Sequence, residues 1–352
     1  FLRFCAVKLA DGGLVCNEKG KVDDSSVPVV NDDASNGQTF RDKDDHVSFW
    51  VPLLTGLSKL TSDPRSAIRK SALEVLFNIL KDHGHLFSRP FWISVFNSVV
   101  FPIFKFVLDK KETLMNDDQS SPASRSPHPE ESTWESETST VAAQCLVDLF
   151  VSFFYVLRSQ LPGVLSILAG FIKGPGQGPM STGVAAFMSL ANDLGGRLSE
   201  DEWGDVFLAL KEAAASTLPG ILKLVRTMDS VEVLDVAHAN NDLEMSSDPG
   251  LTNDDSEDDN LQAAAYAVSR MKSHIAAHLL IIQVITDLYK MHQKFLSAGH
   301  VTIILEICSS VASHAHQLNS ETILQLKLQR ACSILDISEP PMVHFENESY
   351  QN

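Results

Sequence analysis

Four histidines stand in H-x-H pairs, a spacing that raises the question of metal binding. The pairs are His83 with His85 and His314 with His316. On a helix, side chains two residues apart point in different directions, and no cysteine or carboxylate follows either pair at the spacing of a zinc finger. We therefore expect these histidines to cap helix ends or to face solvent.

A second histidine pattern has the spacing of one helical turn. His274 and His278 would share one face of a helix, as the two ligands of the H-E-x-x-H zinc motif do. Ile275, however, stands where that motif has its catalytic glutamate. The sequence therefore predicts no bound metal and no cofactor.

Other arrangements that could support catalysis are weak. The glycines of GPGQGP, residues 174–179, resemble a phosphate-binding loop, but they follow a predicted helix rather than a strand, and no Lys-Ser/Thr pair comes after them. We expect a turn there. No Ser/His/Asp or Cys/His arrangement stands out, so we predict no catalytic residue.

Three serines have neighbours that protein kinases recognise. Ser121 and Ser126 each precede a proline, and Ser256 precedes three acidic residues. Phosphorylation would add negative charge near helix ends and could change packing or partner choice. These serines are our candidate modification sites.

Acidic residues are concentrated in three segments. Residues 17–45, 110–140 and 229–260 together hold more net negative charge than the whole chain, whose net charge is −17. The rest of the chain is therefore near neutral. It has no Arg/Lys-rich stripe with interleaved aromatic residues, so nucleic acid is not an expected partner.

The five cysteines are typical of a reduced, cytosolic protein. Their number is odd, none forms a C-x-x-C pair, and most lie in apolar helical runs. The most apolar runs, 141–157 and 276–285, contain polar residues and do not reach the roughly 20 apolar residues that a membrane span requires. Any membrane association is therefore expected to be peripheral.

Apolar residues recur at helical spacing along most of the chain, whereas the alternation typical of strands is nearly absent. Residues 46–108 indicate three helices joined by short turns. We expect helices also at 138–159, 162–173, 183–194, 200–225, 261–292, 298–315 and 320–335.

Several residues are expected to set the ends of the first helices. Asp63 is the expected N-cap of the second helix, and Pro64 fits its first turn. We place Arg69 with them as a structural residue of the repeat. Gly84 is expected to end this helix as its C′ residue, and Ser88 to cap the next one.

One stretch of the sequence occurs twice. DHGHLFSRPFWISVF, residues 82–96, and DLGGRLSEDEWGDVF, residues 193–207, both follow D-x-G-x-x-x-S-x-x-x-W-x-x-V-F. This pattern indicates an internal helical repeat. The second copy has Leu194 and Gly196 where the first has its two histidines, so the repeat does not require them. The residues assigned to repeat structure are Gly84, Ser88, Trp92 and Phe96 in the first copy and Gly195, Ser199, Trp203 and Phe207 in the second.

The sequence therefore predicts an all-α fold, a HEAT/armadillo-like α-solenoid with long disordered acidic loops. We expect the chain to be a piece of a longer protein. Its expected parts are the end of a preceding repeat helix (1–11), an acidic linker (12–45), helical repeats (46–109), a Ser/Pro-rich linker (110–137), helical repeats (138–229), an acidic disordered loop (230–260), C-terminal helical repeats (261–338) and a tail (339–352).

The run FWVPLLTGLSKLTSDPRSAIRKSALEVLFNILKDHGHLFSRPFWISVFNSVVFPIF closely resembles the C-terminal region of the large brefeldin A-inhibited guanine nucleotide-exchange proteins, especially those of plants. SEDEWGDVFLALKEAA, SHIAAHLLIIQVITDLY, VTIILEICSSVASHAHQLNS and RACSILDISEPPMVHFENESYQN resemble the same family. The resemblance covers nearly the whole chain apart from the three acidic segments.

This resemblance implies a cytosolic protein recruited peripherally to trans-Golgi network and endosome membranes, where it activates ARF-type small GTPases in vesicle trafficking. In that family an upstream Sec-type domain carries out exchange, and neither that domain nor its glutamate motif is found in this sequence. The resemblance therefore implies a non-catalytic regulatory region that contacts the GTPase and other domains of the same exchange factor. The alternative is a generic HEAT-repeat adaptor or a karyopherin-like cargo scaffold.

Overall fold

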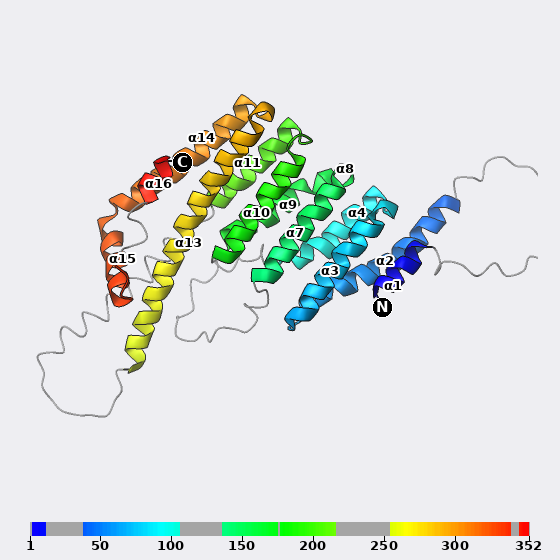
Figure 1. Cartoon of the computed structure of the whole chain (residues 1–352), viewed down its shortest axis with the longest axis horizontal. Coiled ribbons are helices and arrows are strands. Elements are labelled where there is room, and N and C mark those ends of the chain that lie inside the picture. The colour runs from blue at the N-terminus through cyan, green and yellow to red at the C-terminus, as the bar shows by residue number, and fades with distance from the viewer. Residues whose placement is uncertain are drawn as a thin grey trace, which may run out of the picture. The chain divides into compact units, whose positions relative to one another are not determined.

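The computed structural model describes residues 2–11, 38–105, 136–174, 177–215, 254–338 and 345–351, and Figure 1 shows its helices. Every regular element in these ranges is helical, and no strand occurs within them. The predicted all-α class is therefore confirmed.

The chain divides into two compact units, Phe1–Val164 and Leu165–Asn352. The boundary lies inside helix α9, Leu161–Lys173, and not in one of the acidic segments.

In the first unit, long helices pack on one another and short turns join them. Helix α2 packs against α1 and α3, α3 packs against α7, and α4 packs against α8. The elements are α1 (Leu2–Ala10), α2 (Gln38–Leu60), α3 (Ser66–His83), the 3-10 turn η1 (Gly84–Leu86), α4 (Arg89–Val95), the π-turn η2 (Phe96–Val100), α5 (Phe101–Ile103), α7 (Ser136–Ser152), α8 (Phe154–Leu157), the 3-10 turn η4 (Arg158–Gln160) and the start of α9.

In the second unit, the long helix α13 contacts most of the others. It packs against α10, α11, α14, α15 and α16, and α14 in turn packs against α11, α15 and α16. The elements are the rest of α9, then α10 (Gln177–Leu194), α11 (Glu200–Ala215), α13 (Asp254–His292), the 3-10 turn η5 (Gln293–Phe295), α14 (Ala298–Ser320), α15 (Thr322–Ile334) and α16 (Phe345–Gln351).

The third helix predicted in 46–108 is interrupted by the π-turn η2. The N–H of Phe101 donates to the carbonyl of Phe96, five residues earlier. Pro102 follows, and its ring excludes a normal helical bond to the preceding turn. The hydroxyl of Ser58 in α2 donates to the carbonyl of Val99 at 2.9 Å, so a carbonyl of this turn is satisfied from another helix.

Helices occur in segments that were predicted as linker, loop or tail. Helix α2 begins at Gln38 within the predicted linker 12–45, and α16 lies in the predicted tail 339–352. Helix α13 begins at Asp254, inside the predicted acidic loop 230–260. The acidic run there follows the helix N-terminus, where the helix dipole stabilises negative charge. Helix α7 begins at Ser136, so it includes the last two residues of the predicted linker 110–137. The other residues of the three predicted loops lie outside the described ranges.

Among the described residues, Phe154–Lys173 is long and apolar enough to cross a membrane, and half of its most apolar window is buried inside the protein. The 3-10 turn η4, which carries Arg158, interrupts its helical hydrogen bonding.

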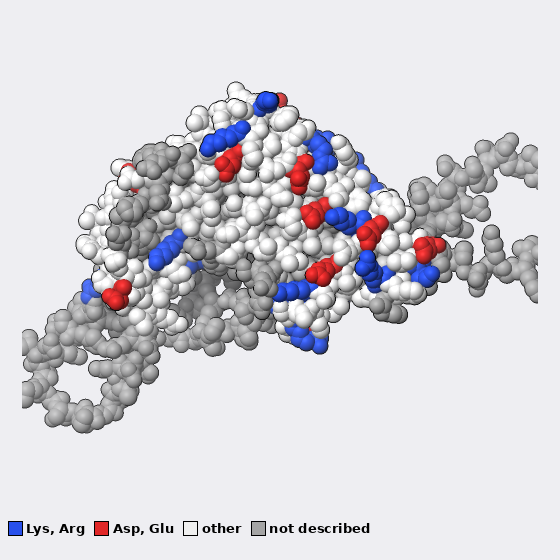
Figure 2. Space-filling view, in the orientation of Figure 1, with Lys and Arg blue, Asp and Glu red and all other residues white. Residues whose placement is uncertain are grey.

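Charged side chains of the described residues are interspersed on the face that Figure 2 shows, with blue and red side chains next to one another. Lys211 of α11 and Glu306 of α14 pair at 2.7 Å, and Lys173 pairs with Glu212 at 3.5 Å. These exposed pairs are each worth little to stability.

Two glycines of the first unit should respond oppositely to alanine. A Cβ at Gly84 would overlap the ring of Trp92 and lie 2.7 Å from Phe153 Cζ, whereas a Cβ at Gly56, inside α2, meets nothing within 4 Å. Gly84→Ala is expected to destabilise the protein by about 1–3 kcal/mol through overpacking. Gly56→Ala should stabilise it by about 0.5–1 kcal/mol through helix propensity. Urea denaturation measures both, and equal effects would contradict the packing role of Gly84.

Candidate functional site

The first copy of the repeat is a close contact between a glycine and a tryptophan. Trp92 is fully buried, and its indole Nε1–H donates to the carbonyl of Gly84 at 3.0 Å. Its ring lies 4.8 Å from that of Phe153, which immediately follows α7. Gly84 does follow the end of α3, but its backbone is right-handed (φ −60°, ψ −22°). A glycine is required there because a Cβ would meet both rings.

The predicted cap of α3 is wrong. The helix begins at Ser66 with Arg65 as its N-cap, so Asp63 and Pro64 both precede it. The Asp63 carboxylate instead accepts hydrogen bonds from the Arg65 backbone N–H at 2.9 Å and from its guanidinium at 2.9 and 3.0 Å. The Arg65 side chain lowers the pKa of Asp63 to about 2.

The buried side chain of Arg69 is hydrogen-bonded to the backbone of the turn that precedes α3. Its side chain is buried, and its Nη1 donates to the carbonyls of Asp63 and Pro64, both at 2.9 Å. Asp63, Pro64 and Arg69 are therefore joined in one turn, although Asp63 is not the predicted N-cap of α3.

The second copy repeats the contact with another ring. Ser199 caps α11, and its N–H donates to the Glu202 carboxylate at 2.8 Å, while the Glu202 N–H donates back to the Ser199 hydroxyl at 3.4 Å. Trp203 is fully buried and stacks on Phe207. A Cβ at Gly195 would overlap the ring of His292, the last residue of α13.

The structure contains a third junction of this form. Helix α13 ends at His292, the 3-10 turn η5 follows, and Ser297 caps α14. The spacing equals that of His83, η1 and Ser88 in the first copy. Val301 stands at the tryptophan position and Gln293 at the glycine position, so the sequence pattern did not reveal this copy.

His300 is a structural residue that the sequence analysis missed. Its Nδ1 accepts from the N–H of Ser297 at 3.1 Å, and its Nε2–H donates to the carbonyl of Glu200 at 2.9 Å. The starts of α14 and α11 are therefore tied by one buried imidazole. The signal was a serine followed three residues later by a side chain that can accept a hydrogen bond.

Three histidines from two helices meet in the second unit. His274 and His278 of α13 and His314 of α14 offer nitrogen atoms that all lie within 4.8 Å of one another. Nε2 of His274 lies 2.8 Å from Nε2 of His314, and Nε2 of His278 lies 3.1 Å from the carbonyl oxygen of Ala214 in α11. The expectation that His314 would cap a helix end or face solvent is wrong, because His314 is half-buried in this cluster. The other H-x-H members, His83, His85 and His316, stay outside it.

Burial keeps these imidazoles neutral. It lowers the pKa of His274 to about 2 and that of His278 to about 4, with the neighbouring histidines acting in the same direction. It lowers the pKa of His314 as well. Neutral imidazole has a free ring lone pair, so this group can accept hydrogen bonds or ligate a metal ion.

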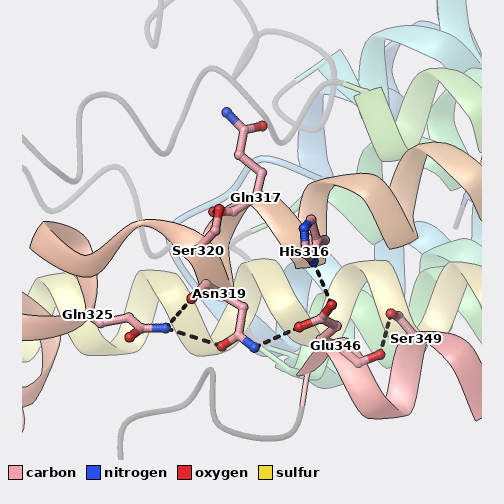
Figure 3. Close-up of polar contacts among 7 residues, drawn as sticks. All are labelled: His316, Gln317, Asn319, Ser320, Gln325, Glu346 and Ser349. Atoms are coloured by element: carbon pink, nitrogen blue, oxygen red, sulfur yellow. Dashed lines mark hydrogen bonds and ion pairs between the residues drawn. The ribbon is translucent and has the colours of Figure 1, made fainter.

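A polar network joins α14, α15 and α16 (Figure 3). Glu346 of α16 accepts hydrogen bonds from His316 Nδ1 at 2.8 Å and from the Asn319 amide at 2.7 Å. The Gln325 amide of α15 donates to the Asn319 side-chain oxygen at 3.2 Å. His316 therefore binds helix α16, whereas its H-x-H partner lies in the histidine cluster.

The candidate phosphorylation sites are not placed beside these residues. Ser121 and Ser126 lie outside the described residues. Ser256 belongs to the first turn of α13, and its side chain is not described. Of the GPGQGP glycines, Gly174 follows the end of α9 and Gly178 lies in the first turn of α10, whereas Gly176 lies outside the described residues.

Two family models match the chain. Residues 50–177 match a model described as a GBF1-like tetratrico peptide repeat region, and residues 276–352 match one described as a BIG2 C-terminal domain. No solved structure matches the chain.

Curated relatives match the whole chain. It is 58% identical to brefeldin A-inhibited guanine nucleotide-exchange protein 1 of Arabidopsis thaliana and 49% identical to protein 4 of the same plant, each over 100% of its length. The chain spans 20% of the length of each of these relatives. It is also 27% identical, over 49% of its length, to the ADP-ribosylation factor guanine nucleotide-exchange factor SEC7 of Saccharomyces cerevisiae.

Removing the ring of Trp92 should be costly. Because Trp92 fills a fully buried site, Trp92→Ala is expected to destabilise the protein by about 3–5 kcal/mol. Leu86→Ala, in the exposed turn η1, should change stability by less than about 0.5 kcal/mol. Urea denaturation followed by circular dichroism compares the two variants. An unfolding midpoint that Trp92→Ala leaves unchanged would reject the core role.

The contact between α16 and α14 should depend on pH. The hydrogen bonds from His316 and Asn319 lower the pKa of Glu346 below its ordinary 4.5. Their contribution is therefore present above pH 4.5 and is lost as the pH falls through the lowered pKa. His316→Gln should raise the pKa of Glu346 in an NMR titration, whereas His85→Gln should not. An unchanged Glu346 pKa in His316→Gln would show that this contact does not form.

Proposed function

The chain belongs to the family of the brefeldin A-inhibited guanine nucleotide-exchange proteins, and from this we propose that it is a non-catalytic, regulatory and scaffolding part of such an exchange factor. The observation that carries the proposal is the extent of the match. The whole of this chain aligns with the two plant relatives, at 58% and 49% identity, but it covers only 20% of the length of each. Most of each relative lies outside the matched region, and we assign the exchange reaction to that larger part.

The architecture of the described residues supports a scaffolding role. The rings of the repeat residues Trp92 and Trp203 pack helices together, since both are fully buried. Arg69 and His300 likewise donate to backbone carbonyls of neighbouring segments. Stacked helices of this kind offer extended surfaces to a partner.

We propose an ADP-ribosylation factor GTPase and other domains of the same exchange factor as partners. The name of the yeast relative SEC7 specifies a guanine nucleotide-exchange factor for ADP-ribosylation factor. We further propose that the parent protein acts in the cytosol and peripherally on trans-Golgi network and endosome membranes, in vesicle-mediated transport. Phosphorylation of Ser121, Ser126 or Ser256 would adjust these contacts by adding charge.

Nucleotide exchange on ADP-ribosylation factor tests the proposal. The release of fluorescent GDP should be accelerated by the full-length parent and by the parent without this region, whereas this chain alone should leave the spontaneous rate unchanged. The deletion should instead alter recruitment of the parent to Golgi membranes in cells.

The outcomes separate the alternatives. Exchange by this chain alone would overturn the non-catalytic assignment. The absence of exchange by the full-length parent would favour an adaptor or cargo scaffold. Unchanged recruitment in the deletion would remove the regulatory role.

A further inference from the structure

The group formed by His274, His278 and His314 has the composition of a transition-metal site. Imidazole nitrogen is a preferred ligand of zinc, and three histidines with a water molecule complete a four-coordinate zinc ion. Helical spacing pairs His274 with His278, but it does not join His314 to them, because His314 lies 36 positions after His278. The packing of α13 on α14 brings them together.

The hydrogen bonding of His278 prepares one ligand. The carbonyl of Ala214 can only accept a hydrogen bond, so Nε2 of His278 must carry the proton and Nδ1 the lone pair. Metal-bound histidines commonly donate their second ring nitrogen to a backbone carbonyl in this way, which fixes both tautomer and ring orientation.

The other two ligands already meet at short range. Their Nε2 atoms are 2.8 Å apart, whereas two nitrogens bound to a tetrahedral zinc ion are separated by about 3.3 Å, given Zn–N bonds of about 2.0–2.1 Å. One ring nitrogen of each histidine lies within 4.8 Å of a ring nitrogen of the other two. Rotation of the rings can therefore bring one nitrogen of each histidine to coordination distance. Coordination then needs a change of tautomer in one ring: the Nε2 that donates in the 2.8 Å contact must give up its proton, and Nδ1 of the same ring must carry one instead.

We propose that His274, His278 and His314 bind one divalent transition-metal ion, zinc being the best match, through Nε2, Nδ1 and Nε2 respectively. The ion joins α13 to α14, and the Ala214 hydrogen bond extends the connection to α11. Binding of the ion stabilises the packing of the C-terminal helices. It does not depend on the proposed role in nucleotide exchange.

Titration of the chelator-treated 352-residue chain with zinc chloride tests the site. In competition with a chromophoric chelator, the wild type should bind one zinc ion per chain and melt at a higher temperature with zinc than without it. Cobalt chloride should give the visible absorption of a four- or five-coordinate cobalt ion. His314→Gln should weaken zinc binding by at least about tenfold, the lower end of what even outer-shell substitutions cost.

The chain provides a matched control on the same helix. His316 lies two residues from His314 but points to Glu346, so His316→Gln should bind zinc as the wild type does. His314→Cys should restore binding, because thiolate is also a zinc ligand, and should add a sulfur-to-cobalt charge-transfer band in the near ultraviolet. Restored zinc binding in His314→Cys would show that His314→Gln lost a ligand and not its fold.

Two results would overturn the proposal. One is a wild type that binds zinc no more tightly than His314→Gln does. The other is a His314→Cys chain that binds zinc but shows no charge-transfer band when cobalt is bound in its place. In either case the three imidazoles are a hydrogen-bonded packing group of the core.

Discussion

The close approach of a helix to an aromatic ring at a glycine is the constraint on which the repeat junctions depend. At Gly84 the missing side chain lets Trp92 reach the backbone carbonyl and lets Phe153 cover the same point. Any Cβ would push these rings away, and protein interiors are too densely packed to absorb such a shift. The close packing of α3, α4 and the end of α7 therefore depends on one small residue, Gly84.

The helices and the repeat could be predicted from the sequence because both depend on local spacing. Trp92 and Trp203 are 111 residues apart yet lie in the same pattern and the same type of junction. Local reasoning failed at Asp63, where the competing hydrogen bonds of Arg65 and the reach of Arg69 moved the start of α3 to Ser66. Two carbonyls accepting from a buried arginine cannot be inferred from helix-capping preferences.

The histidines show a different limit of sequence reasoning. H-x-H spacing paired His314 with His316, but residues two apart on a helix face apart, so one side chain points to α13 and the other to α16. The partners that matter come from other helices and depend on packing. His300 was missed for the related reason that a histidine at the third helical position can replace the glutamate of a capping box.

Comparison of the junctions indicates where the repeat tolerates change. The ring that covers the glycine is Phe153 in the first copy and His292 in the second, and each comes from the end of the next described long helix, α7 or α13. Trp92 Nε1 donates to Gly84, whereas the buried Nε1 of Trp203 has no acceptor among the described residues. The hydrogen bond is thus not what the two copies share. They share a large ring against a backbone without a Cβ, so shape rather than polar recognition defines the unit.

The third junction lacks both glycine and tryptophan, and there a buried imidazole, His300, joins α14 to α11. Polar contacts therefore take over where the ring and the glycine are absent.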